Sequence, residues 1–199
     1  MPSKRYAHAV LTVVASLWLA STALGASIYI PDPAHTIVGF TARHFVITKV
    51  TGRFNDYTAT IVYDENDITK SSLQGTIKTA SLNTGNERRD ANLRSADFFD
   101  VEKFPEIKFH STRVEKQGEG YVLIGPLTIR DVTREVAIPF MVTGKLVDRG
   151  KERIGFEASL KINRKDFGMT WDKRMDNGGL IASDQIDIEL SVEAVKNQS

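Results

Sequence analysis

The amino-acid sequence predicts an all-β protein, a barrel of eight antiparallel strands with one short helical insertion. Two observations support this prediction. Polar and apolar residues alternate along eight segments, and turn-forming residues separate most of these segments. The eight segments are 36–46, 53–63, 72–82, 105–115, 121–130, 134–147, 153–163 and 185–195. Eight strands can close into a barrel with one apolar inner face, a shape that can hold a single elongated apolar ligand.

The N-terminal segment 1–25 is typical of a secretory signal peptide. Lys4 and Arg5 supply a positive start, residues 9–20 form an apolar run, and residues 21–26 offer small side chains to a peptidase. A membrane anchor is the alternative interpretation, but this apolar run is shorter than the about 20 residues that span a bilayer. We therefore expect a cleaved signal peptide.

Cleavage after Gly25 or Ala26 would leave one domain, residues 26–199. A chain of this length suits a single domain with a substantial hydrophobic core. It contains no second apolar run long enough for a transmembrane helix, so we expect no stable membrane insertion.

Composition removes several classes of function from consideration. The chain has 26 Lys and Arg and 25 Asp and Glu side chains, and because Lys4 and Arg5 lie in the expected signal peptide, 24 basic and 25 acidic side chains remain. Phosphate-backbone binding needs concentrated positive charge, so nucleic acid is not an expected partner. Cysteine is absent, which excludes thiol nucleophiles, cysteine-ligated zinc and iron–sulfur clusters.

Three C-terminal segments show the alternation most clearly. Their alternating apolar residues are Val136, Ile138, Phe140, Val142 and Leu146 in 134–147, Ile154, Phe156, Ala158, Leu160 and Ile162 in 153–163, and Ile186, Ile188, Leu190 and Val192 in 185–195. The positions between them in the last two segments are mostly charged or polar. A period of two with one charged side predicts half-buried antiparallel strands.

Turn-forming residues support hairpin connections. Residues 117–120 and 148–150 contain glycine between two predicted strands, which is typical of hairpin turns, and residues 177–179 belong to a longer loop before the last strand. Pro126 and Pro139 fall within predicted strands. Because proline donates no backbone hydrogen bond, we expect a bulge or a sheet edge at each.

One segment favours a helix. Thr84 and Glu87 have the spacing of a capping box, and residues 88–96 contain good helix formers without Pro or Gly. We predict a short helix over 85–97, capped by Thr84 and followed by an irregular turn to Pro105.

The histidines outside the expected signal peptide are His35, His44 and His110, and none of them pair at the spacing of a zinc site. His44 shares strand parity with Val38 and Phe40, so we expect it to point inward. There it could anchor a ligand head group, act as a general base, or be a core histidine bonded to a backbone carbonyl. We expect His35 in a turn and His110 in solvent.

No catalytic motif is evident. The chain has no Gly-x-Ser-x-Gly elbow, phosphate-binding loop or dinucleotide fingerprint. Asp97, Asp100 and Glu102 form a carboxylate cluster that could perform acid–base chemistry, although a solvated loop is the simpler interpretation. We predict a binding protein, not an enzyme, with no catalytic residues, metal or cofactor.

An aromatic cluster follows the predicted helix. Phe98, Phe99 and Phe104 lie in a connection that lacks strand periodicity. Such large apolar side chains favour burial, so we expect them to cap one end of the barrel or to form a lid over a cavity mouth.

Four stretches resemble the YceI-like family of bacterial exported proteins, also called the polyisoprenoid-binding protein family. They are PAHTIVGF at 33–40 leading to His44, GRF at 52–54, RRDANLRSADFFD at 88–100 leading to FPEIKF at 104–109, and NRKDFGM at 163–169. The resemblance covers essentially all of the chain after the signal peptide, and the stretch 88–100 is the most specific. One position departs: Asp131 stands where the family usually has Gly, and Asp tolerates turn geometry better than most other residues.

The resemblance implies an extended, lipocalin-like antiparallel barrel that holds an isoprenoid or another long-chain amphiphile in its interior. It also implies a periplasmic location. It assigns no catalytic residue.

Strand parity and the aromatic cluster predict the ligand contacts of such a carrier. The predicted contacts are Phe40, Arg43, His44, Ile61, Phe98, Phe99, Phe104, Ile138, Phe140, Phe156, Leu160, Ile188 and Leu190. The apolar members would line a tunnel, Arg43 and His44 would supply polar groups at its mouth, and the phenylalanines that follow the predicted helix would shape the entrance.

Three alternatives remain open from the residues. The same cavity could belong to an enzyme that acts on a lipid or quinone with His44 as general base. The alternation also fits an outer-membrane barrel with its apolar face outward, although residues 194–199 lack the terminal aromatic residue common in that class. Apolar side chains on strand edges could also pair two copies into a homodimer.

Overall fold

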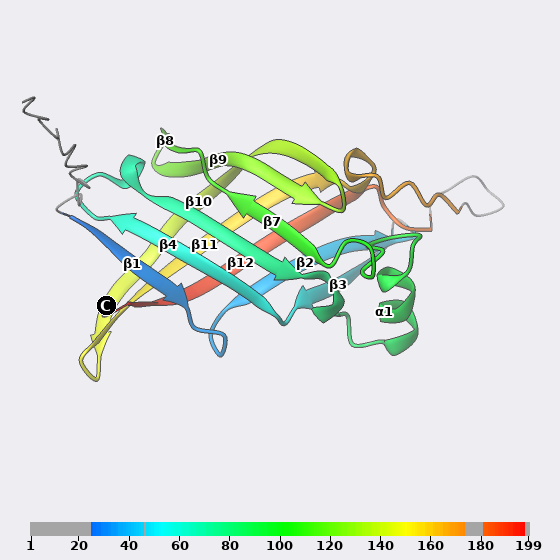
Figure 1. Ribbon diagram of the computed structural model, residues 1–199, viewed down its shortest axis with the longest axis horizontal. Coiled ribbons are helices and arrows are strands. Elements are labelled where there is room, and N and C mark those ends of the chain that lie inside the picture. The colour runs from blue at the N-terminus through cyan, green and yellow to red at the C-terminus, as the bar shows by residue number, and fades with distance from the viewer. Residues whose placement is uncertain (1–24, 46, 174–180, 198–199) are drawn as a thin grey trace, which may run out of the picture.

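The computed structural model describes residues 25–45, 47–173 and 181–197, so the expected signal peptide up to residue 24 and the loop glycines of 177–179 lie outside the described residues. The described chain forms an elongated barrel whose strands run obliquely along its long axis, with an α-helix at one end (Figure 1). Among the described residues, eight antiparallel strands close the barrel and one short α-helix is inserted, which confirms the predicted fold class.

The described residues form more strands than the sequence predicts, and β10, β11 and β12 are longer than predicted. The strands are β1 (Ala26–Pro31), β2 (Ile37–His44), β3 (Thr48–Phe54), β4 (Tyr57–Asp64), β5 (Ser72–Lys78), β6 (Leu82–Asn83), β7 (Glu106–His110), β8 (Arg113–Gln117), β9 (Gly120–Ile129), β10 (Val132–Asp148), β11 (Lys151–Asn163) and β12 (Gln185–Lys196). The helix α1 spans Glu87–Arg94, and the 3-10 turns η1, η2 and η3 span Ile68–Lys70, Thr79–Ser81 and Arg164–Phe167.

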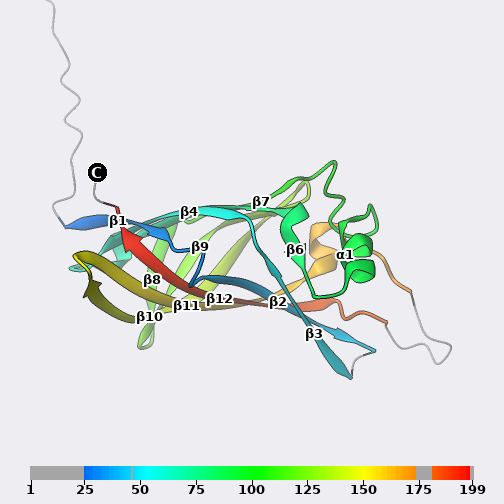
Figure 2. The ribbon, with the colours of Figure 1, turned by 90° about the horizontal axis from the view of Figure 1, so that it is seen from below.

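The closed ring has the order β1, β4, β5, β7, β9, β10, β11 and β12, and β12 pairs back with β1. The strands β2, β3 and β6 extend this wall toward the α1 end. On β12, residues 194–196 pair with β1 and residues 187–191 pair with β2, so β2 continues the line of β1. Figure 2 shows β2 and β3 as a hairpin that projects beyond the ring at this end.

Some predicted strand boundaries are wrong. The predicted segment 53–63 breaks at residues 55–56, between β3 and β4, and the segment 105–115 breaks at residues 111–112, between β7 and β8. The second break follows from the pairing of β9, which uses residues 120–124 with β8 and residues 127–128 with β7. The strand β1 was not predicted, because its short sequence borders the signal peptide.

Of the two expectations for the prolines, a bulge or a sheet edge, the structure shows the second, as a local break in a neighbouring ladder. Pro126 lies on β9 between the part that pairs with β8 and the part that pairs with β7. Pro139 immediately precedes the β10–β11 ladder, which starts at Phe140. Each proline therefore sits where a neighbouring ladder is interrupted and its missing donor is tolerated. The register shift of the β10–β11 pair lies instead between Val142 and Gly144.

The turn between β9 and β10 consists of Arg130 and Asp131, and the left-handed residue is Arg130, with a φ of 58°, not Asp131. Two-residue hairpin turns favour a positive φ at the first central position. The Arg130 guanidinium donates to the carbonyl of Gly168 at 2.9 Å and lies 5.2 Å from the Phe104 ring centroid.

The helix α1 is shorter than predicted and has a different cap. Asn86, not Thr84, is the N-cap residue, and its side chain accepts a hydrogen bond from the Arg89 amide at 3.0 Å. The Thr84 amide and hydroxyl instead donate to Asp90, which is buried. The capping-box prediction is wrong because the helix starts two residues later, after Gly85 with a φ of 74°.

Buried apolar side chains of the described residues form one cluster at each end of the barrel and a third, Val114, Leu123 and Ile138, between β8, β9 and β10. At the α1 end the cluster consists of Phe54, Leu82, Ile107, Leu127, Ile129, Phe167 and Met169. At the opposite end it consists of Tyr29, Tyr63, Ile154 and Ala194. Inward residues of the middle, such as Phe156 and Leu160, remain only half-buried although the sheet surrounds them.

Within the described ranges, we find no helix of the length and apolarity that crossing a membrane requires.

Gly125 allows β9 to pass closely beneath the β7–β8 bend, because a Cβ at this position would lie 2.0 Å from the His110 carbonyl oxygen. We predict that Gly125→Ala destabilises the protein by about 1–3 kcal/mol, since the backbone must move apart. Gly144→Ala is the matched control, because a Cβ at Gly144 meets no atom within 4 Å. Thermal unfolding should show a melting temperature several degrees lower for the first variant, and equal melting temperatures would contradict the crossing geometry.

An ionic cluster outside the cavity ties the β1–β2 turn to β11 and β12. The Arg153 guanidinium donates to Asp32 at 2.9 Å and also to Glu193, and the Asp32 amide donates to the Glu193 carbonyl at 2.8 Å. Hydrogen bonding to Arg153, followed by that to His35, lowers the pKa of Asp32 to about 2. The folded state therefore favours the ionised carboxylate.

This lowered pKa predicts a loss of stability in acid. The contribution of Asp32 is fully present above the ordinary aspartate pKa of about 4 and is lost as the pH falls toward about 2. Asp32→Asn should therefore flatten the pH dependence of the unfolding free energy in this window, measured by urea denaturation. Glu157→Gln, an exposed outward position on β11, is the control. An Asp32→Asn profile that matches the wild type would rule out this role.

Candidate functional site

A cavity of about 780 Å³ lies along the interior of the barrel. Its wall consists of the inward faces of the strands, because successive inward residues on one strand line it together. On β12 these are Ile186, Ile188, Leu190 and Val192, and on β11 they are Phe156, Ala158, Leu160 and Ile162. Six residue steps along an extended strand measure about 20 Å. The cavity is therefore long and narrow.

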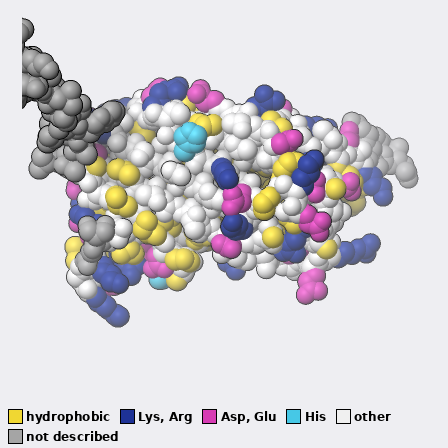
Figure 3. Space-filling model, viewed as in Figure 1, with side chains coloured by type: hydrophobic (Ala, Val, Ile, Leu, Met, Phe, Trp, Pro, Cys, Tyr) yellow, Lys and Arg dark blue, Asp and Glu magenta, His cyan; other side chains and the backbone are white. Residues whose placement is uncertain are grey.

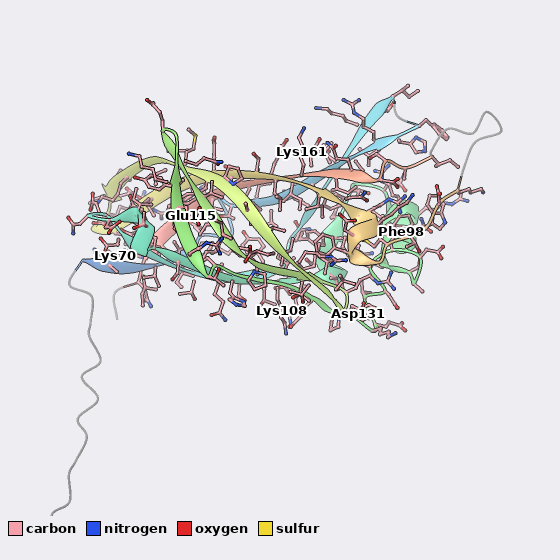
Figure 4. All side chains as sticks on the ribbon, turned by 90° about the horizontal axis from the view of Figure 1, so that it is seen from above. Lys70, Phe98, Lys108, Glu115, Asp131 and Lys161 are labelled. Atoms are coloured by element: carbon pink, nitrogen blue, oxygen red, sulfur yellow. The ribbon has the colours of Figure 1, made fainter. Side chains whose placement is uncertain are left out.

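One end of the cavity is closed and the other opens beside α1. At the closed end, Tyr63 lines the cavity and packs edge-on against Tyr29, which is 2 % exposed. At the α1 end the lining includes the exposed residues Arg43, His44 and Arg88. Figure 4 shows Phe98 at this end and Lys70 of η1 at the other, with Lys108, Glu115 and Lys161 outside the barrel.

Most of the predicted ligand contacts line this one cavity. They are Phe40, Arg43, His44, Ile61, Phe98, Phe99, Ile138, Phe140, Phe156, Leu160, Ile188 and Leu190. Strand parity placed the members from β2, β4, β10, β11 and β12 on the inner face. Whether these residues contact a ligand remains a prediction.

Phe104 is the exception among the predicted contacts. Its ring lies near the Lys103 ammonium at 5.1 Å and the Arg130 guanidinium at 5.2 Å, and it does not line the cavity. The prediction grouped it with Phe98 and Phe99 because the three are close in sequence. The intervening turn at Asp100, with a φ of 50°, separates Phe104 from them.

Aromatic rings form the inner wall near the mouth. Phe99 contacts Phe54 with a centroid distance of 5.6 Å, and Phe54 contacts Phe40 at 5.5 Å. Phe98 is buried against Trp171 at 5.3 Å. The two phenylalanines after α1 thus join the barrel wall to the segment after η3. Their expected role, a cap on this end of the barrel or a lid over the cavity mouth, stays a prediction.

His44 lies at the mouth and not in the packed core. It is exposed, lines the cavity, and has its ring centroid 3.8 Å from that of Phe45. Among the described residues, no carboxylate lies within hydrogen-bonding distance of its ring. A general base of the triad type needs such an orienting partner, so the geometry gives His44 the position of a rim residue.

Sequence reasoning missed the part of the lining that comes from outside the strands. Asn86, Arg88, Arg89, Asn92 and Leu93 of the α1 segment line the cavity, as do Trp171, Ile181, Ala182 and Ser183 near β12. These residues carry no period-two signal. The only available signal was the resemblance, whose most specific stretch includes the helix.

The sequence also did not predict a split in the barrel wall, by which we mean a stretch of β4 without a paired strand on one edge. β1 pairs with β4 only over residues 61–64 of β4, so residues 57–60 have no strand partner on that edge among the described residues. The Tyr57 hydroxyl bridges this split by donating to the Thr36 carbonyl at 3.4 Å. Burial raises the pKa of Tyr57, so the hydroxyl stays protonated and able to donate.

Charged side chains on the outer surface are mixed. Figure 3 shows Lys and Arg interspersed with Asp and Glu on one face. One group could in principle hold a metal ion: ligand atoms of Asp32, His35 and Glu193 lie within 4.8 Å of one another. It lies outside the cavity, and Arg153 already occupies both carboxylates. We assign it to the ionic cluster.

Comparison with known proteins gives consistent matches. A family model described as YceI-like domain matches residues 29–194. A UPF0312 protein of Photorhabdus laumondii is 39% identical over 194 residues, which cover 94% of this chain and 96% of that protein. A UPF0312 protein of Serratia proteamaculans is 39% identical over 188 residues, with 94% and 95% covered.

Solved structures share the architecture. The YCEI protein of Campylobacter jejuni matches with a TM-score of 0.68 and 34% identity, covering 79% of this chain and 90% of that one. Burkholderia cenocepacia BcnA matches with a TM-score of 0.72 and 23% identity, covering 82% and 98%. A polyisoprenoid binding domain from Saccharophagus degradans matches with a TM-score of 0.59 and 13% identity, covering 86% and 99%. The last two matches show the fold alone.

Two alanines test whether the interior is open in the middle and packed at the closed end. Ala158 lines the cavity, whereas Ala194 is 0% exposed within the closed-end cluster. We predict that Ala158→Phe is tolerated, because the ring can enter the cavity, and that Ala194→Phe costs about 1–3 kcal/mol or more through overpacking. Urea denaturation measures both. Equal destabilisation by the two substitutions would contradict an open middle.

Proposed function

The chain belongs to the YceI-like family, and from this premise we propose that it is a binding and carrier protein that holds a polyisoprenoid or similar long-chain amphiphile inside its barrel. The single observation that supports this most directly is the narrow apolar cavity whose lining includes exposed residues at the α1 end. The Saccharophagus degradans domain of the same fold is described as polyisoprenoid binding, which agrees with the proposal.

The energetics favour a long chain over a short one. Each buried methylene contributes about 0.8 kcal/mol, whereas association costs about 4–15 kcal/mol in lost freedom. About twenty buried carbons would contribute about 16 kcal/mol on this scale. A ligand of this kind needs no strong polar contact to bind.

The cavity size sets a scale for the ligand. A volume of about 780 Å³ equals that of about 26 liquid water molecules. Because a carbon with its hydrogens is similar in size to a water molecule, a volume of this order corresponds to about 25 chain carbons. The narrow shape favours one extended chain over a compact ligand.

The carrier would work in the periplasm. This part of the proposal rests on the segment 1–25, which has the charge, apolar run and small residues of a signal peptide. Osmotic shock of the source cells tests it, because a periplasmic protein is released while a cytoplasmic one is retained. Retention with membranes through salt washing would instead favour the outer-membrane barrel.

Native mass spectrometry of the protein purified from its source tests the carrier proposal. We expect a co-purifying long-chain lipid, identified after solvent extraction. Ala158→Phe should lower its occupancy or shift it to shorter chains, because the ring takes up cavity volume, while the surface variant Gly144→Ala should match the wild type. A protein that is repeatedly empty and does not take up added prenyl lipids would contradict the proposal.

A second candidate function is an enzyme that acts on a lipid or quinone, and its supporting observation is that His44 lines the mouth. His44→Ala separates the two functions. Loss of a general base should lower turnover by about 10²- to 10⁴-fold, whereas retention of the bound lipid should change only modestly. A product formed from the bound lipid by the wild type and not by the variant would favour the enzyme.

A further inference from the structure

The rim of the cavity carries positive charge without negative charge. The cavity lining contains Arg43, Arg88, Arg89 and Arg164 together with His44, and no Asp or Glu among the residues that the structure describes. Basic and acidic side chains are nearly equal in number over the chain and mixed on its surface. A lining that contains arginines but no Asp or Glu is therefore a specific local feature and not a consequence of overall composition.

Two of these arginines are already engaged in the structure. Arg164 is 3 % exposed and donates to Asp184 at 2.8 Å and to the carbonyls of Met169 and Ser183, so its charge is neutralised. Arg89 donates to the hydroxyl and carbonyl of Thr84 at 2.7 and 2.9 Å. Its charge has no carboxylate partner, because Thr84 stands between it and Asp90.

Arg43 and Arg88 are free to bind a ligand. Both are exposed, and neither guanidinium has a hydrogen bond or ion pair with a described residue. They come from separate parts of the fold, Arg43 from the end of β2 and Arg88 from the first turn of α1. Because both line the same cavity, the mouth has a cationic group on the strand side and another on the helix side.

Several nearby carboxylates are directed elsewhere. Asp90 of α1 is buried and accepts from Thr84, and Asp184 pairs with Arg164 and with Lys165 at 2.9 Å. Glu87, next to Arg88, does not line the cavity. An anion at the mouth would thus meet arginines without a competing carboxylate in the described lining.

We propose that this rim, Arg43, Arg88 and Arg89 with His44, binds an oxyanionic head group, so that the ligand is an acidic long-chain amphiphile and not a neutral lipid. The inference rests on the proposed carrier function and adds the class of head group. Guanidinium groups bind phosphate and carboxylate oxygens through paired charge-assisted hydrogen bonds. The apolar wall below the rim keeps the charged end at the mouth, because burying an unpaired charge costs free energy whereas burying the apolar chain releases it.

Matched probes test the head group. The protein is purified from its source, freed of bound lipid, and titrated with farnesyl phosphate and farnesol, and with hexadecanoic acid and hexadecanol. We expect each acidic probe to bind about tenfold or more tightly than its alcohol, a difference of about 1.4 kcal/mol. This ratio should shrink as salt increases, since the rim is solvent-exposed. Comparing the two acids separates a phosphate site from a carboxylate site.

Variants test the residues. The double variant R43Q/R88Q should bring the ratio of acid to alcohol affinity close to one. The control K116Q/K151Q removes the same charge from exposed positions on β8 and β11 outside the cavity lining, and it should keep the wild-type ratio.

The possible failures are distinguishable. Equal binding of acids and alcohols by the wild type would overturn the head-group proposal and leave the carrier function intact. A preference for acids that persists in R43Q/R88Q would overturn its assignment to this rim. Failure of all four probes to bind would count against the carrier function itself.

Discussion

The structure depends on one constraint: the inward apolar side chains of the strands do not fill the space that the barrel encloses. An empty apolar cavity is destabilising, because its lining loses dispersion contacts that neither side chains nor solvent replace. The interior must therefore be occupied, by solvent or by an apolar ligand, and a ligand that displaces this solvent gains the hydrophobic free energy that the chain itself leaves unused.

The sheet prevents the cavity from collapsing. Collapse would require the ring of hydrogen-bonded strands to open or flatten, and β12 prevents this by pairing with β11 on one side and with both β1 and β2 on the other. The clusters at the two ends supply packed cores that hold the ring in shape. Together with the cluster of Val114, Leu123 and Ile138 in the wall and with the backbone ladders, they stabilise a barrel that still leaves space in its interior.

Periodicity in the sequence is sufficient to predict the wall but not the rim. Leu160 and Leu190 were placed inward because a strand side chain has only two directions, and the sheet confirms that both line the cavity. Arg88 and Trp171 lie in segments where no such rule applies, so their approach to the cavity depends on tertiary contacts. The predictions of Phe104 as a cavity contact and of Thr84 as the helix cap were wrong for the same reason. One turn residue, or a shift of the helix start to follow Asn86, redirects a side chain.

This division between wall and rim has a consequence for specificity. The wall residues are tied to the fold, because each inward side chain also packs against its neighbours on the sheet. The Arg43 and Arg88 side chains, in contrast, are exposed, and their guanidinium groups have no partner among the described residues. Substitutions at such positions usually change stability by less than about 0.5 kcal/mol. In the proposed carrier, rim substitutions would therefore change the head-group preference while the tunnel, and with it the affinity for a long chain, stays the same.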